Sequence, residues 1–142
     1  MTTVKQILDT KGYAVWSIRP QESVFTAIQQ MAEKEVGALI VMEGDAIVGI
    51  ISERDYARKV ILNGRSSHET AVRDIMTPHV ICVRLEQSLE ECMTIVTERR
   101  IRHLPVLDSG RLVGIISIGD LVKTIIVEQQ FIIEQLEHYI RS

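Results

Sequence analysis

One short stretch that occurs twice decides the fold of this chain. The first occurrence reads Val48-Gly49-Ile50-Ile51-Ser52-Glu53-Arg54-Asp55, and the second reads Val113-Gly114-Ile115-Ile116-Ser117-Ile118-Gly119-Asp120. A β-branched run that ends in serine, with an acidic residue three positions later, is typical of a strand that leads directly into a capped helix. We therefore expect a strand-to-helix turn at each of the two places.

The similarity between the two copies extends well beyond this stretch. When residues 18–62 are placed on residues 83–127 without gaps, 12 of 45 positions are identical. Residues 4–7 match residues 72–75 at an offset of 68 instead of 65, so the first copy carries three extra residues near Gly12. Two copies are too few for a solenoid and favour a closed pair with pseudo-twofold symmetry. We expect copy one in 1–62, a polar surface linker in 63–71, copy two in 72–127 and a helical extension in 128–142.

Each copy has the same order of elements. Ser23 and Ser88 stand where a helix should begin, and Ser88 with Glu91 predicts a capping box. The expected strands are 15–18, 38–42 and 46–51 in copy one, and 80–83, 103–107 and 111–116 in copy two. A second helix is expected after Ser52 and after Ser117. The pattern predicts an α+β fold, in which two pseudo-symmetric strand-helix-hairpin-helix units pack small sheets on helices.

Composition excludes several classes of protein. The chain has 142 residues, 46% of them apolar and 4% aromatic, which is too apolar for a disordered protein. The longest strongly apolar runs have seven residues, which is too few for a membrane-spanning helix. A net charge of −3 makes nucleic-acid binding unlikely as a function. The N-terminus has no secretory pattern, so a cytoplasmic location is the default expectation.

Cysteines and histidines give no sign of a metal site. Cys82 and Cys92 lie ten positions apart without a CxxC pattern, and we expect two buried thiols. The four histidines fall in four separate segments without ligand spacing. No metal is therefore expected.

The last segment carries a longer helical pattern than its counterpart in copy one. Its apolar stripe consists of Leu121, Ile125, Ile132, Leu136 and Ile140. We expect the excess stripe to pack on the same core or on a second subunit, which leaves a dimer and a tetramer open.

The repeated turn has two interpretations. A structural one makes serine the helix cap, the acidic residue its capping-box partner, and the glycine a relief for close strand packing. A functional one uses the helix N-terminus for a phosphate and the aspartate for both hydroxyls of a ribose. The turn occurs twice and has cations nearby, which favours the functional interpretation; these cations are Arg54, Arg58, Arg99, Arg100, Arg102 and His103.

These residues resemble a known family. Over essentially its whole length the chain is similar to a tandem CBS-domain pair, also called a Bateman module. The resemblance rests on the two Gly-h-h-Ser-x-x-Asp segments (h is apolar), Arg102-His103-Leu104-Pro105-Val106 and Asp74-Ile75-Met76-Thr77-Pro78. The run 51–59 followed by residues 63–67 also resembles stand-alone pairs of bacteria and plant mitochondria.

The resemblance implies two adenosine-nucleotide clefts between the copies. One would use Ser52, Arg54, Asp55, His79, Val80, Ile81, Arg102, His103 and Pro105. In that cleft Asp55 would hold the ribose, Ser52 and the cations the phosphates, and the backbone near Val80 the adenine. The other would use Thr10, Lys11, Gly12, Tyr13, Val15, Gly37, Ala38, Ser117, Gly119 and Asp120. This second cleft should bind phosphate differently from the first, because Gly37 stands in place of Arg102 and Gly119 in place of Arg54.

The expected function is therefore that of a non-enzymatic sensor. The ligand implied is an adenosine nucleotide, AMP in the first place, with ADP, ATP or NAD(H) as alternatives. The expected partners are a second copy of the chain and an effector protein that the sequence does not identify. The alternative is a protein–protein interaction or dimerisation module with vestigial clefts. An enzyme is disfavoured, because Ser52 and Asp55 lie one helical turn apart without a base between them and no G-x-S-x-G motif is present.

Overall fold

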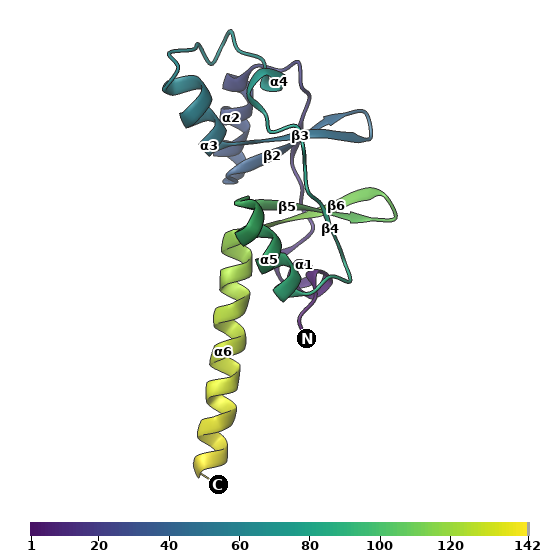
Figure 1. Cartoon of the computed structure of the whole chain (residues 1–142), viewed down its shortest axis with the longest axis vertical. Helices are drawn as coiled ribbons and strands as arrows, with labels where there is room; N and C mark the ends of the chain where they lie inside the picture. Colours follow the sequence, from purple (N-terminus) through teal and green to yellow (C-terminus); the bar gives the residue numbers. More distant parts are fainter. Residues whose placement is uncertain (142) are drawn as a thin grey trace. The chain divides into compact units, whose positions relative to one another are not determined.

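The computed structural model describes residues 1–141 and divides the chain into two compact units. The central unit is Ala14–Cys82, and the terminal unit combines Met1–Tyr13 with the chain from Val83 onward. These units do not coincide with the two sequence copies. The helix that opens each copy belongs to the compact unit that holds the rest of the other copy (Figure 1).

The central unit is a three-stranded sheet with helices. Its sheet has the order β1-β2-β3, with β1 parallel to β2 and β2 antiparallel to β3. The elements are β1 (Ser17–Ile18), α2 (Val24–Lys34), β2 (Ala38–Glu43), β3 (Ala46–Ser52), α3 (Glu53–Tyr56), the π-helix η1 (Ala57–Ile61) and α4 (Val72–Ile75).

The terminal unit repeats this topology with the order β4-β5-β6. Its elements are α1 (Val4–Lys11), β4 (Val83–Arg84), α5 (Leu89–Arg99), β5 (His103–Asp108), β6 (Arg111–Ser117) and α6 (Ile118–Arg141). The two hairpins even share an irregularity, because the register shifts between Val41 and Met42 and again between the equivalent Val106 and Leu107. The predicted α+β fold of two pseudo-symmetric units is confirmed.

Each unit has its own core. In the central unit the core includes Val24, Leu39 and Ile51, and in the terminal unit it includes Leu8, Leu104 and Leu121, all of them fully buried. Leu8 comes from α1, at the other end of the chain from Leu104 and Leu121. Burial of α1 in this core therefore fixes the end of the helix, Thr10 and Lys11, beside β6 and α6.

Helix ends follow the sequence closely, with one difference. The side chains of Ser23 and Ser88 accept hydrogen bonds from the backbone N–H of Thr26 and Glu91, as predicted. The predicted capping box at Ser88 is only half formed, since the Glu91 carboxylate accepts instead from the Gln87 side chain. A neighbouring amide donor thus replaces the N-cap backbone as the partner of Glu91.

Two further expectations needed correction. The short strands are β1 and β4 with two residues each, because only these residues align with β2 and β5. The linker at 63–71 is mostly exposed, but its end packs on α2: Ser67 and Thr70 accept from the first N–H groups of that helix, and Thr70 is buried. In the part of the chain that the structure describes, no helix has the length and apolarity to cross a membrane.

Candidate ligand-binding turns

The turn of the terminal unit is built by Ser117 and Asp120 at the junction of β6 and α6. The Ser117 N–H donates to Asp120 Oδ2 over 2.8 Å, and the Asp120 N–H donates to Ser117 Oγ over 3.1 Å. These reciprocal bonds form the capping arrangement that the structural interpretation predicted. They also hold the carboxylate at the N-terminus of a helix of 24 residues, where the dipole favours negative charge.

Lys11 brings a cation to this turn. Its Nζ lies 2.6 Å from Asp120 Oδ2 and donates to the backbone oxygen of Ile115 over 2.6 Å. Burial by itself would raise the pKa of Asp120, but the hydrogen bonds from Lys11 and Ser117 outweigh it and hold the pKa below its ordinary value. Asp120 is therefore a carboxylate at neutral pH, and the ammonium beside it is a second anchoring group.

The chain reverses beside this ion pair. Gly12 ends α1 with φ of 111°, a conformation that an L side chain rarely adopts, and its N–H donates to Leu8 O over 2.6 Å. Tyr13 then folds back, and its hydroxyl donates to Asp9 Oδ1 over 2.6 Å, which raises the pKa of Tyr13 and lowers that of Asp9. Of the N-terminal residues implied for this cleft, Lys11 contacts Asp120 directly.

The turn of the central unit is built in the same way. Ser52 N–H and Ser52 Oγ both donate to Asp55 Oδ2 over 3.0 Å, and Asp55 N–H donates to Ser52 Oγ over 3.1 Å. Here the cation is Lys59, whose Nζ lies 3.2 Å from Asp55 Oδ1 and donates to the backbone oxygen of Ile75 over 2.9 Å. Lys59 was not among the predicted site residues, although its spacing of four from Asp55 was a usable signal.

The segment after α4 runs beside this turn. Ile50, two residues before Ser52, exchanges two backbone hydrogen bonds with Thr77, over 3.0 and 2.9 Å. His79, Val80 and Ile81 follow directly, with His79 exposed and the other two half-buried. At the offset of 68, His79 is the counterpart of Lys11, so each turn has the end of an opening helix as its neighbour.

The motif glycines are explained by close packing. A Cβ on Gly49 would lie 2.5 Å from Met76 Sδ and 3.0 Å from Thr77 O, and one on Gly114 would lie 2.8 Å from Leu8 Cδ1. Both contacts are with the opening-helix segments that supply the neighbours of the turns. The prediction that these glycines relieve close packing is confirmed, and no side chain fits there without movement of the neighbour.

The starts of the hairpins lie beside the turn of their own unit. Gly37 O accepts from Glu53 N–H over 3.1 Å, and the equivalent Arg102 O accepts from Ile118 N–H over 2.9 Å. Ala38 pairs with Ser52 in the sheet, and His103 pairs with Ser117. Arg54, Arg102 and Gly119 are exposed, Val15 is half-buried and Pro105 is buried. The family resemblance assigned Arg102, His103 and Pro105 to the cleft of Ser52, and Val15, Gly37 and Ala38 to the cleft of Ser117. Each set belongs to a different compact unit from its serine, so this assignment stays a prediction.

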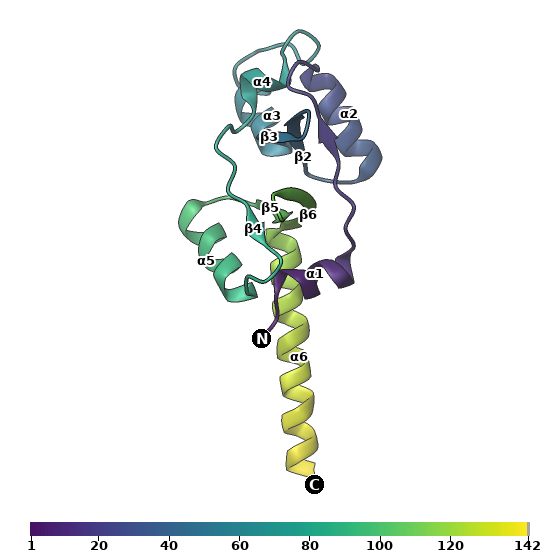
Figure 2. The same cartoon turned by 90° about the vertical axis from the view of Figure 1, so that its right-hand side faces the viewer.

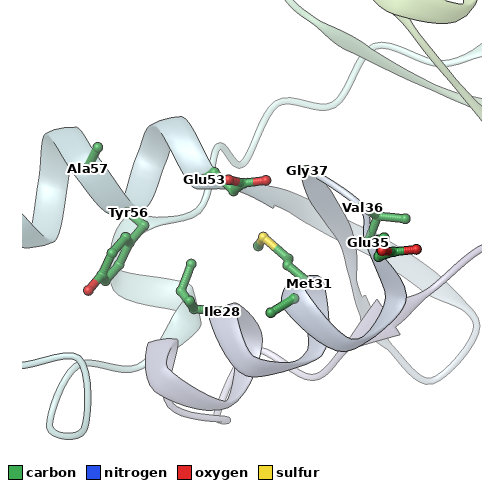
Figure 3. A pocket seen from close by; sticks show the side chains of 9 residues that line it. Ile28, Met31, Glu35, Val36, Gly37, Glu53, Tyr56 and Ala57 are labelled. Atoms are coloured by element: carbon green, nitrogen blue, oxygen red, sulfur yellow. The ribbon is translucent and has the colours of Figure 1, made fainter.

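A groove lies between α2 and α3 of the central unit (Figure 3). It has a volume of about 540 Å³, and Ile28 and Met31 point into it from α2. Glu53, the residue after Ser52, lies at its rim, and Tyr56 borders it from α3. The groove is mainly apolar and bears carboxylates but no cation among its lining residues, so it does not suit a phosphate.

The candidate metal ligands of the described chain are its His, Cys, Asp and Glu side chains, and its two cysteines are free thiols. Among residues 1–141 no group of three or more His, Cys, Asp or Glu side chains is placed to hold a metal ion. Burial raises the pKa of the Cys82 thiol, and it raises that of the fully buried Cys92 to about 11. Neither thiol is activated as a nucleophile or a ligand.

Comparison with known proteins matches this geometry to one family. The model of the CBS domain matches twice, over residues 4–62 and 72–127. The mitochondrial CBS domain-containing protein CBSX3 of Arabidopsis thaliana is 37% identical, over 99% of this chain and 73% of its own length.

Solved structures agree. A candidate signal-transduction protein with CBS domains from Burkholderia ambifaria is 53% identical, has a TM-score of 0.86, and covers 90% of this chain and 96% of its own. A CBS domain pair in complex with 5′-methylthioadenosine and S-adenosyl-L-methionine has a TM-score of 0.79 over 90% of this chain and 98% of its own. At 23% identity, that second likeness is one of fold.

Proposed function

We propose that this chain, which belongs to the CBS-domain family as a tandem pair, is a non-enzymatic regulatory module that binds an adenosine-containing ligand. The ligand would be held at the Ser52/Asp55 turn, at the Ser117/Asp120 turn, or at both. One observation carries this proposal: each turn holds an aspartate carboxylate in a fixed position, with a lysine ammonium within 3.2 Å of it.

The two charged groups match two parts of a nucleotide. A fixed carboxylate accepts hydrogen bonds from the two hydroxyls of a ribose, as acidic residues do in dinucleotide sites. The ammonium of Lys11 or Lys59 is a point charge for a phosphate. At the Ser117/Asp120 turn the N-terminus of α6 adds the positive end of its dipole.

The chemistry of the turns selects a class of ligand, an adenosine ribose with phosphate, and leaves several candidates within that class. AMP is the first choice, with ADP, ATP and NAD(H) as alternatives, because all four combine an adenosine ribose with phosphate. A CBS pair of the same fold binds adenosine compounds without phosphate, so S-adenosylmethionine belongs among the probes. Arg54 and Arg102 are proposed to add charge for a ligand with several phosphates, and the ligand needs no metal.

Calorimetric titration of ligand-free protein with AMP, ADP, ATP, NAD, NADH and S-adenosylmethionine tests the proposal. In Asp55→Asn and Asp120→Asn, loss of a charge-assisted hydrogen bond should weaken binding about ten- to hundredfold at the affected turn. Asp45→Asn and Asp108→Asn are matched controls, because each removes an exposed carboxylate from a hairpin turn of the same unit. Unchanged affinity in both test variants would refute the assignment of the turns.

Two other outcomes separate the alternatives. If no adenosine compound binds, the alternative of an interaction module with vestigial clefts gains support. If a bound nucleotide is consumed on long incubation, as followed by chromatography of the nucleotide, the non-enzymatic assignment is wrong. Intact nucleotide together with saturable binding supports a sensor.

A sensor reports the binding of its ligand by a change in its contacts with another molecule. A ligand shifts a conformational equilibrium only by its difference in affinity for the two states. We propose that the reporting contact is made with a second copy of the chain, as a dimer or a tetramer, and with a separate effector protein in the cytoplasm.

A further inference from the structure

Helix α6 continues far beyond the core that holds its beginning. Leu121 is fully buried and Ile125 packs on the terminal core, but every residue from Gln129 to Arg141 is exposed. Figures 1 and 2 both show this second half of α6 extending away from α1 and α5 of the same unit. Contacts within the unit therefore do not account for its apolar residues.

Most of the exposed apolar residues of α6 lie along a regular seam, which also contains the polar Gln129. Its members alternate at spacings of four and three: Val122, Ile126, Gln129, Ile133, Leu136 and Ile140. This is the heptad repeat of a helix that packs against another helix, with isoleucine at every a position and Val122, Gln129 and Leu136 at the d positions. Ile132 and Tyr139 widen the seam on one side, at g positions, while Ile125 at the first g position packs on the terminal core.

The apolar area of the seam is comparable with the largest apolar patch on a typical monomer, which is often a functional surface. Seven of its apolar side chains are between 45% and 81% exposed: Val122, Ile126, Ile132, Ile133, Leu136, Tyr139 and Ile140. At about 100 Å² for a fully exposed aliphatic side chain, they present roughly 400 Å² per molecule. Two such seams, with their polar flanks, approach the roughly 1,000 Å² that mark a specific interface.

We propose that this seam pairs with α6 of a second molecule of the chain in antiparallel orientation. The inference does not depend on the proposed nucleotide function. In the register that places Ile126 against Leu136 of the second molecule, Val122 lies against Ile140. At the flanking g positions, Ile132 is then nearest to Ile132 of the second molecule. The self-complementary spacing of the seam is what identifies a second molecule as the occupant.

The charges beside the seam support the antiparallel orientation. Lys123, Gln130 and Glu137 occupy the three e positions. In antiparallel pairs e positions face e positions, so that register places Lys123 opposite Glu137 of the second molecule, twice by symmetry. In a parallel pair e faces g, and Glu137 would lie against Ile132 without a cation.

Gln129 interrupts the seam near its midpoint. A polar residue at one core position costs stability but fixes orientation and register. In the antiparallel register the two Gln129 side chains lie about one helical turn apart, on either side of the twofold axis, where their amides are in reach of one another. The interruption therefore fits a pair that is centred on this part of α6.

Sedimentation equilibrium on the full chain tests the pairing. Ile133→Lys should reduce the mass at micromolar concentration about twofold, because it places two lysines in the centre of the seam. Phe131→Lys is the matched control, since Phe131 is also more than half exposed but lies on the opposite face of α6. Equal masses for the parent and Ile133→Lys, or a monomeric parent, would overturn the proposal.

Orientation is tested by exchange of charges. Lys123→Glu alone should weaken association several-fold, and Lys123→Glu with Glu137→Lys should restore it, because the pair is re-formed with reversed sign. In a parallel pair the two residues lie about 21 Å apart along the helices, so the double variant would not recover. A double variant as weak as Lys123→Glu would overturn the antiparallel assignment.

Discussion

Replacement of Gly114 by alanine tests whether the close approach of α1 to β6 holds the Ser117/Asp120 turn together. The new Cβ would lie 2.8 Å from Leu8 Cδ1 and 3.0 Å from Leu8 Cδ2, and Leu8 is fully buried. A methyl group forced into a packed core costs about 1–3 kcal/mol. We therefore expect Gly114→Ala to lower the free energy of unfolding of the terminal unit by about 2 kcal/mol.

Urea denaturation followed by far-UV circular dichroism measures this loss. The fluorescence of Trp16 follows the central unit, because the chain has a single tryptophan and it lies there. The circular dichroism transition should move to lower urea, and the fluorescence transition should follow only if the units unfold together. Gly119→Ala is the control, since its Cβ meets only Ser117 Oγ, at 3.5 Å.

A double variant separates a steric clash from other causes. Leu8→Ala alone should cost about 2–5 kcal/mol, because it leaves a cavity. In Gly114→Ala with Leu8→Ala the added methyl group no longer meets the leucine, so the double loss should be smaller than the sum by about 1–2 kcal/mol. Additive losses, or a Gly114→Ala protein as stable as the parent, would refute the packing argument.

Three further outcomes follow from the contacts of the turns and from the thiols. The pKa of Asp120 is lowered in the folded chain, so its stabilising contribution is complete above the ordinary value of 3.8 and is lost as the pH falls through the lower folded value. Lys11→Met should move acid unfolding, followed by circular dichroism, to higher pH, and an unchanged midpoint would contradict the ion pair. Ser52→Ala should lower the free energy of unfolding of the central unit by about 1 kcal/mol in urea, from loss of a helix cap. Iodoacetamide at pH 8 should alkylate half-buried Cys82 before Cys92, because Cys92 is fully buried and its pKa is raised to about 11. Peptide mass spectrometry reads the order of alkylation, and the reverse order would contradict the burial.

The fold was largely predictable because the sequence contains two copies of the same unit. The offset of 65 fixed both hairpins to within a residue, since strand length and turn position had to agree between the copies. The serine caps were predictable for a local reason: the cap and its N–H donor lie three residues apart. What could not be predicted is the unit to which α1 and α4 belong, because that depends on contacts between segments far apart in the sequence.

The contacts within the two candidate turns were only partly predictable from the sequence. Ser52, Asp55, Ser117 and Asp120 followed from a repeated local pattern, and their mutual bonds are local. The approach of Lys11 to Asp120 spans more than a hundred positions and came only from the family resemblance. Lys59 was missed because its copy-two counterpart is Thr124, so the repeat gave no second instance of the lysine.

The two turns should not bind a nucleotide equally well, because their lysines use different carboxylate oxygens. At Asp120 both Ser117 N–H and Lys11 end on Oδ2, whereas at Asp55 the Ser52 groups end on Oδ2 and Lys59 on Oδ1. A ribose diol is held best when it donates to both oxygens of one carboxylate. At Asp55 the diol has to compete with Lys59 for Oδ1, while at Asp120 the bonds from Ser117 and Lys11 converge on Oδ2 and a 24-residue helix adds its N-terminal dipole. The Ser117/Asp120 turn should therefore bind AMP more tightly, and in Lys59→Met the affinity of the Ser52/Asp55 turn for adenosine, which lacks phosphate, should rise. If calorimetry of Asp120→Asn leaves the tighter of two AMP sites intact, this ranking of the turns is wrong.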